Sequence, residues 1–198
     1  MDLTPPTLAG RHVRLVPLTL RHVSALWEVA NDEEIWRWTL SQIRSEDDMR
    51  RYVEAALAGG GIPFATTEIG TGRVVGSTRY HSPDPTNRRV EIGYTWIGRQ
   101  WQRTPVNTEA KYLMLRHAFE TLGCIRVELR TDALNTRSRN AIVRIGAVEE
   151  GILRKHMRTD SGRFRDTVYF SILEDEWPAV KQRLEEKLAR PWTPSAET

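Results

Sequence analysis

The chain has 198 residues, 39% of them hydrophobic and 28% charged, which is typical of one globular domain and excludes a disordered or fibrous protein. Its formal net charge is only +3, and 29 lysines and arginines are spread among 26 acidic residues, so no basic block indicates a nucleic-acid-binding arm. The single cysteine, Cys124, excludes an intramolecular disulfide framework and a cysteine-based metal cage. Its favoured interpretation is a small buried hydrophobe.

The N-terminal stretch argues against membrane targeting. No apolar run approaches the roughly 20 residues needed to cross a bilayer. Residues 1–15 contain an acidic residue and two prolines where a signal peptide would have a basic start and an apolar core. We therefore expect a cytoplasmic protein that acts on neither membranes nor nucleic acids. A basic pocket for one phosphorylated small molecule fits the pI of about 9.2.

The first half of the chain predicts helices followed by a meander of strands. Alternating apolar residues predict strands over 11–18, 62–69, 74–81 and 90–97. Thr19 is expected to cap a helix that ends near Ala30, and Ser45 with Asp48 to open another that stops at the glycines 59–61. Residues 82–89 are expected to form a polar loop.

The second half predicts a strand–helix–strand crossover. The pattern favours a helix over 106–122, a strand over 125–132, a short helix capped by Asn135, two more strands over 148–156 and 164–173, and a last helix over 177–188. Residues 1–190 then make one domain, and 191–198 are expected to be a disordered tail. A ligand would lie at the carboxyl ends of the strands that flank the central helix.

Two stretches beside that helix offer ligand-binding groups. The loop RQWQRTPVNTEAK (99–111) suits an anion, because a helix N-terminus presents free N–H groups; Pro105 fits its first position and Arg103 adds a charge. Thr104 is the expected N-cap, and Val106, Asn107 and Thr108 would supply N–H groups; a plain proline-started helix is the alternative. Asn135 and Ser138 are either caps or ligand contacts.

Taken together, the segments resemble the GNAT acetyltransferase superfamily, and more closely its branch of ribosomal-protein N-terminal acetyltransferases. The motifs that carry this resemblance are GRHVRLVPLTLRHVSALWEVA (10–30), VEIGYTWIGRQWQRTPVNTEAKYLMLRHAFETLG (90–123) and RVELRTDALNTRSRNAIVRIGAVEEGILRKH (126–156). The resemblance runs from about Gly10 to Leu188. It implies an α/β (α+β) domain with a mixed, mostly antiparallel sheet of six to seven strands, a central βαβ crossover and helices on both faces. Acetyl-CoA would insert where the fourth and fifth strands splay apart.

The resemblance also implies roles for individual residues in binding coenzyme A. Gln100 matches the first position of a Gln/Arg-x-x-Gly-x-Gly/Ala pyrophosphate loop, whereas Arg103 and Pro105 replace its two small residues. Arg103 would compensate for the lost glycine with its charge. The backbone of Tyr94, Thr95 and Trp96 would pair with the pantetheine arm, Asn135 would bind pantetheine, and Ser138 would lie near the thiol.

The implied reaction is direct attack of a neutral primary amine on acetyl-CoA, which needs a base. Glu91 matches a position where family members keep a carboxylate; the alternative is a salt bridge with Arg88 or Arg89. The family's acidic tyrosine is absent, since its position reads Ile142, so Ser138 is the expected donor to the leaving thiolate. An acyl-CoA-binding sensor with weak catalysis is the alternative function.

The acceptor side is expected around NDEEIWRWTL (31–40). Asp32, Glu33, Glu34, Trp36 and Trp38 suit a cationic amine, although lid or dimer packing is the favoured interpretation of the two tryptophans. The expected acceptors are a protein N-terminus, an amino acid, a polyamine or a drug amine, and a homodimer is expected. No metal-ligand spacing occurs, and solvated or packing histidines are the default for His81 and His156.

Overall fold

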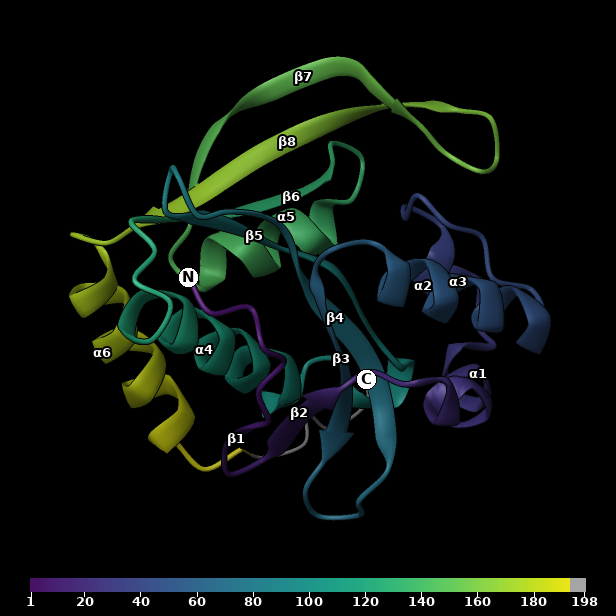
Figure 1. Ribbon diagram of the computed structural model, residues 1–198, viewed down its shortest axis with the longest axis horizontal. Coiled ribbons are helices and arrows are strands. Elements are labelled where there is room, and N and C mark those ends of the chain that lie inside the picture. Colours follow the sequence, from purple (N-terminus) through teal and green to yellow (C-terminus); the bar gives the residue numbers. More distant parts are fainter. Residues whose placement is uncertain (193–198) are drawn as a thin grey trace.

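The computed structural model describes residues 1–192, which form one eight-stranded sheet with helices on both faces (Figure 1). The strands are β1 (Leu8–Ala9), β2 (Val13–Pro17), β3 (Ile62–Glu68), β4 (Val74–Asp84), β5 (Arg89–Ile97), β6 (Arg126–Asp132), β7 (Val148–Arg158) and β8 (Phe164–Leu173). The helices are α1 (Val23–Ala30), α2 (Glu33–Trp36), α3 (Glu46–Ala58), α4 (Pro105–Glu120), α5 (Thr136–Arg144) and α6 (Trp177–Ala189), with 3₁₀ turns at Leu20–His22 and Arg99–Trp101.

The sheet order is β1-β2-β3-β4-β5-β6-β8-β7, and β5 with β6 is its parallel pair. The other neighbouring strands pair antiparallel, so the predicted mixed sheet with a βαβ crossover through α4 is confirmed. The eighth strand is β1, whose two residues are too few to carry an alternation signal. The predicted polar loop is shorter than expected, because β4 continues to Asp84 and β5 begins at Arg89.

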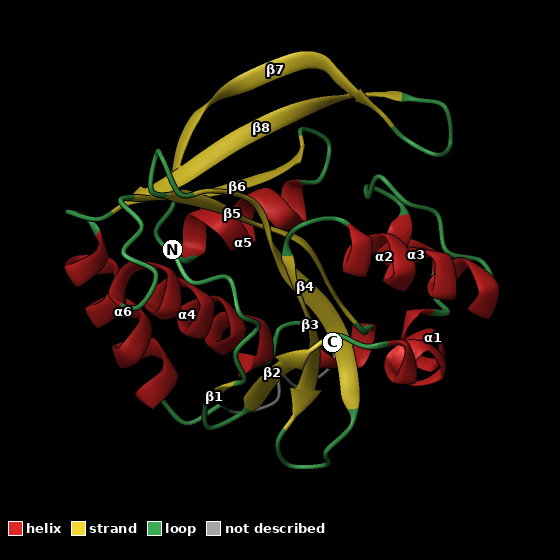
Figure 2. Cartoon of the chain, viewed as in Figure 1, coloured by secondary structure: helices red, strands yellow, loops and turns green. Residues whose placement is uncertain are grey.

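Alternating side chains divide the core between the two faces of the sheet. Leu15 and Phe64 pack in the larger cluster with α4 and α6, whereas their neighbours Val16 and Ala65 pack in the cluster formed by α1 and α3. Figure 2 shows α4 and α6 on one side of the strands and α1, α2 and α3 on the other. This arrangement leaves the middle of β5 between two helical layers.

Buried carboxylate contacts fix the position of α4. The side chain of Glu109 is buried and accepts hydrogen bonds from the backbone N–H groups of Arg11 (2.8 Å), His12 (2.6 Å) and Val13 (2.8 Å). These three donors belong to the turn and strand at the start of β2. One side chain therefore connects the start of α4 to β2, near the edge of the sheet.

The predicted tail lies mostly outside the described residues, which end at Trp192. The indole Nε1 of Trp192 donates to the backbone oxygen of Arg103 at 3.3 Å, so the last described residue contacts the loop before α4.

Candidate functional site

The two parallel strands separate soon after they begin. β5 and β6 pair only at Arg89–Arg126, Val90–Val127 and Glu91–Glu128. Beyond that point β5 has a bulge, where the register with β4 shifts between Ser77 and Arg79 and Tyr94 has a φ of 50°. A cavity of about 690 Å³ lies between the separated strands. This separation is the splay that the family resemblance implied.

The loop before α4 forms one end of this cavity. Thr104 is the N-cap, as predicted, and its hydroxyl accepts from the Val106 N–H at 3.3 Å and donates to the Trp101 carbonyl at 2.7 Å. Arg103 has a φ of 62°, so an arginine occupies the left-handed conformation that glycine usually supplies in such loops. The loop thus keeps the backbone shape of a glycine-containing turn and adds a cation.

The loop residues that line the cavity include only three of the six that were predicted. Gln102, Arg103, Thr104 and Asn107 line it, whereas Gln100 is exposed and does not. The prediction for Gln100 was therefore wrong, because the 3₁₀ turn over Arg99–Trp101 turns residue 100 towards solvent and brings residue 102 to the wall. Val106 and Thr108 are buried and do not line the cavity, so their predicted role in binding coenzyme A stays a prediction.

The same end of the cavity carries several polar groups suited to coenzyme A. Arg137 and Arg144 join Arg103 in its lining, and Arg137 donates to the Gln102 side chain at 2.8 Å. The Asn107 Oδ1 atom is buried and has no hydrogen-bond partner within residues 1–192. Because buried polar atoms are nearly always paired, this oxygen marks a place for a ligand donor. The residues present fit a pyrophosphate and an amide-bearing arm.

Asn135 and Ser138 are placed by the capping of α5. The Asn135 Oδ1 atom accepts from the Ser138 N–H at 3.0 Å and caps α5. Both residues also line the cavity, opposite β5. Capping therefore holds them at the wall, where their remaining polar atoms can reach a ligand.

Lys111 is a cavity residue that sequence reasoning missed. It lies on α4 one turn after Asn107, is buried, and donates to the hydroxyl of Thr95. It forms no ion pair with the residues that the structure describes. Burial lowers the pKa of its ammonium group to about 7, although Glu91 opposes this effect. Tyr94, Thr95 and Trp96 line the cavity beside it.

Replacing Lys111 by methionine is expected to stabilise the protein at neutral and acidic pH. The wild-type lysine binds its proton more weakly in the folded chain than at its usual pKa of 10.5, so it costs on the order of 4 kcal/mol below about pH 7 and progressively less as the pH rises towards 10.5. Thr78 and Thr95 keep each other as hydrogen-bond partners at 2.7 Å. Urea unfolding at pH 6 and pH 9 should therefore show stability rising with pH in the wild type and much less in Lys111→Met; equal pH dependence would contradict a neutralised lysine.

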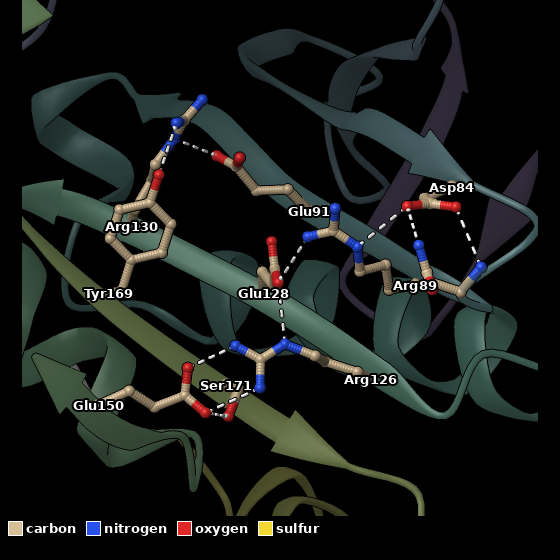
Figure 3. A network of polar contacts seen from close by, with 10 residues as sticks. Asp84, Arg89, Glu91, Arg126, Glu128, Arg130, Glu150, Tyr169 and Ser171 are labelled. Carbon is tan, nitrogen blue, oxygen red and sulfur yellow. Dashed lines mark hydrogen bonds and ion pairs between the residues drawn. The ribbon is translucent and has the colours of Figure 1, made fainter.

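Glu91 lies on the opposite face of β5 from Lys111's helix. Its carboxylate is 2.9 Å from Arg130 Nε, and the two side chains point toward one another (Figure 3). Burial raises the pKa of Glu91, and Arg130 counteracts the effect. The prediction of a salt bridge with Arg88 or Arg89 was wrong: Arg89 pairs with Asp84 and Glu128, and Arg88 Nε donates to the Gly123 carbonyl.

The acidic residues of the α1–α2 segment do not form the acceptor side. Asp32 pairs with Arg99 at 2.7 Å, and Glu33 and Glu34 are exposed. From this segment Trp36 and Trp38 line the cavity, together with Ile35 and residues 39–41. The prediction of an acidic amine site here was wrong, because capping and surface pairing use the carboxylates. Trp36 and Trp38 nevertheless form part of the cavity wall.

The end of the β7–β8 hairpin closes this side. The Asp160 N–H donates to the Leu40 carbonyl at 2.9 Å, and Asp160 Oδ2 accepts from the Gln42 N–H at 3.1 Å. Figure 1 shows the hairpin reaching across to the segment around α2. The cavity therefore runs from the start of α4, between the splayed strands, to an aromatic chamber under the hairpin.

The cysteine and the two histidines considered in the sequence have packing roles. Cys124 is buried, and burial raises the pKa of its thiol to about 11, which confirms a small hydrophobe. His81 packs edge-on to Tyr94 and His156 to Tyr169. Among residues 1–192 no group of three His, Cys, Asp or Glu side chains could hold a metal ion, and no helix in that range is long and apolar enough to cross a membrane.

Known proteins resemble this chain over most of its length. A model of the family described as "Acetyltransferase (GNAT) domain" matches residues 12–148. The "Putative ribosomal N-acetyltransferase YdaF" of Bacillus subtilis is 36% identical over 110 residues, which cover 56% of this chain and 59% of that protein. The matches to the two curated relatives thus span about three fifths of their length.

Solved structures match more completely. A "putative acetyltransferase" from T. thermophilus is 40% identical with a TM-score of 0.88 and covers 95% of this chain and 100% of its own. A GCN5-related N-acetyltransferase from Brucella melitensis is 33% identical with a TM-score of 0.89, covering 94% of this chain and 86% of its own.

Proposed function

Since the chain belongs to the GNAT acetyltransferase family, we propose that it is an acetyl-CoA-dependent N-acetyltransferase that acts by direct attack of a primary amine in a ternary complex. The observation that carries this proposal is the continuous cavity through the splay of β5 and β6. One end has an anion-binding helix start, and the other has a buried carboxylate. Such a passage lets a thioester and an amine enter from opposite faces of the sheet.

The first end suits coenzyme A. The start of α4 and the side chains of Arg103, Arg137 and Arg144 would hold its phosphates through backbone N–H groups and charge. Asn107 and Asn135 would bind the amides of the pantetheine arm, which would run along Tyr94, Thr95 and Trp96. When bound, acetyl-CoA supplies an activated acetyl group.

The second end suits the amine. Glu91 would accept the proton that the amine releases, directly or through water, and its buried position favours a protonatable carboxyl group. Arg130 holds that carboxylate in a fixed orientation. Gly93 leaves room for it, because a Cβ atom there would lie 2.8 Å from Glu91 Oε1. Ser138, on the coenzyme A side, would donate a proton to the leaving thiolate.

The alternative of an acyl-CoA sensor is not favoured. A sensor needs a coenzyme A site but no chamber beyond the thioester, whereas this cavity continues to Glu91 and the tryptophans of the α2 segment. The description of YdaF as a ribosomal N-acetyltransferase supports a protein N-terminus among the acceptors. The need for acetyl-CoA supports the cytoplasmic location expected from the sequence.

We also propose a homodimer. The tryptophans do not support it, because Trp36 is buried and Trp38 lines the cavity. Strand β7 supports it instead, since it ends the sheet and exposes Val148, Ile152 and Leu153. Sedimentation of the purified chain would give the mass that decides between one and two copies.

Titration calorimetry with acetyl-CoA tests the coenzyme A site. Micromolar binding is expected, weakened about tenfold or more by Arg103→Ala and by Asn135→Ala, since each removes a hydrogen bond to a charged or buried polar group. Arg116→Ala, on the exposed face of α4, is the matched control. Release of CoA thiol with a panel of amines then tests catalysis. Absence of binding by the wild type would rule out the transferase proposal.

A further inference from the structure

The acceptor side of the cavity contains one buried arginine without a carboxylate partner. Arg165 lies on β8 and lines the cavity, with only 6% of its surface exposed. Its Nε atom donates to the Thr167 hydroxyl at 3.0 Å. Within residues 1–192 its two terminal nitrogens have neither a hydrogen-bond acceptor nor an ion-pair partner, so they are available to a ligand.

Three neighbouring arginines on this face of the sheet, on β5 and β6, are paired with carboxylates. Arg89 and Arg126 contact Glu128, Arg126 also contacts Glu150, and Arg130 contacts Glu91 and the Tyr169 hydroxyl (Figure 3). Arg165 and Arg79 are the buried arginines outside this ladder of charges, and of these two only Arg165 lines the cavity. An unpaired buried guanidinium group is costly, so it is expected where a ligand completes it.

The nearby carboxylates are already used by other partners. Asp132 is held by Arg163 and by the Leu134 N–H, and Glu91 is held by Arg130. Burial lowers the pKa of Arg165, and the charges of Asp132 and Glu91 counteract part of this effect while Arg130 adds to it. Arg79 adds a further guanidinium group beside the chamber, stacked 3.8 Å from the Tyr94 ring centre.

We propose that the acceptor amine carries a carboxylate, which the Arg165 guanidinium group binds while the amine faces Glu91. This inference rests on the transferase function proposed above and narrows its acceptor class. A planar guanidinium group matches a carboxylate in two parallel hydrogen bonds, and this one is already oriented by Thr167. The positive charge of Arg165 would repel a second ammonium group on the acceptor, which disfavours polyamines as acceptors. The carboxylate has two sources: the α-carboxylate of a free amino acid, or an acidic side chain near a peptide N-terminus.

Matched acceptor pairs test the inference through release of CoA thiol. One arm compares free amino acids with their amides. The other compares peptides that have Asp or Glu at the first or second position with peptides that have Asn or Gln there. In at least one arm the carboxylate member is expected to have a kcat/KM about tenfold to a hundredfold higher. The arm that shows the preference identifies the source.

In Arg165→Gln, the ratio of kcat/KM for the carboxylate acceptor to that for its amide is expected to fall close to one. The kcat/KM for the amide acceptor itself should stay within about twofold of wild type. Turnover of the amide thus reports that the variant is folded. Arg165→Lys keeps the charge and should retain part of the preference. Arg154→Gln, an exposed arginine on β7 that does not line the cavity, is the matched control and should keep the whole ratio.

Three results would overturn the inference, and they separate it from the proposed function. Efficient turnover without any preference for carboxylate acceptors, or an equal loss for both members of a pair in Arg165→Gln, sinks the inference and leaves the transferase intact. Absence of turnover with every acceptor, despite acetyl-CoA binding, sinks the transferase and the inference together.

Discussion

Glu91→Gln is expected to lower kcat/KM for amine acetylation by about 10² to 10⁴, the usual contribution of a positioned general base. Glutamine has nearly the same shape and can still accept a hydrogen bond from Arg130, but it cannot take a proton from the amine. The affinity for acetyl-CoA is expected to change little, because the phosphate-binding groups lie at the other end of the cavity. Steady-state kinetics and calorimetry on the same preparation measure the two effects separately.

The pH dependence of kcat/KM provides a second test of Glu91 as the base. Burial raises the pKa of Glu91 above its usual 4.5, and the base works only in the deprotonated form. The kcat/KM of the wild type should therefore fall as the pH drops through that raised pKa, and Glu91→Gln should lack this acidic limb. Glu128→Gln is the matched control, since Glu128 lies on the same face but does not line the cavity. A wild-type rate in Glu91→Gln would leave the residue as an ion-pair partner only.

Glu109→Ala is expected to have the largest effect on stability, lowering the free energy of unfolding by about 3 to 5 kcal/mol. The change leaves the N–H groups of Arg11, His12 and Val13 without their acceptor in a largely buried place. Urea unfolding with a fixed slope measures the loss. Glu54→Ala on the exposed face of α3 is the control and should stay within about 0.5 kcal/mol of wild type.

The same substitution links stability to coenzyme A binding. Glu109 is in the second turn of α4, whose start supplies the anion-binding N–H groups, so a loosened α4 should also bind acetyl-CoA more weakly. Gly10→Ala provides an independent check, because a Cβ atom there would lie 2.4 Å from the Glu109 carboxyl carbon. A loss below about 1 kcal/mol in Glu109→Ala would mean that water replaces the carboxylate.

Short-range signals in the sequence determined most of the elements and the loop proposed to bind coenzyme A. Ser45, Thr104 and Asn135 cap helices at the predicted positions, because a cap depends on residues only two or three apart. The strands followed from alternation, which each segment carries by itself. The loop before α4 could be assigned to anion binding because a helix start attracts anions whatever its side chains. The family resemblance supplied the mixed sheet and the splay.

The tertiary structure alone decided the acceptor end. Glu91 and Arg130 are 39 positions apart, and they meet only because three residue pairs join β5 to β6 before the strands separate. The structure also decided which side chains line the cavity. The turn over Arg99–Trp101 exposes Gln100 and brings Gln102 to the wall, and the packing of α4 buries Lys111 and thereby lowers its pKa. Local propensity has no information about these contacts, since register, bulges and burial arise only when distant strands pack. Arg165 looks like any surface arginine in the sequence, and its burial without a carboxylate makes it a site residue.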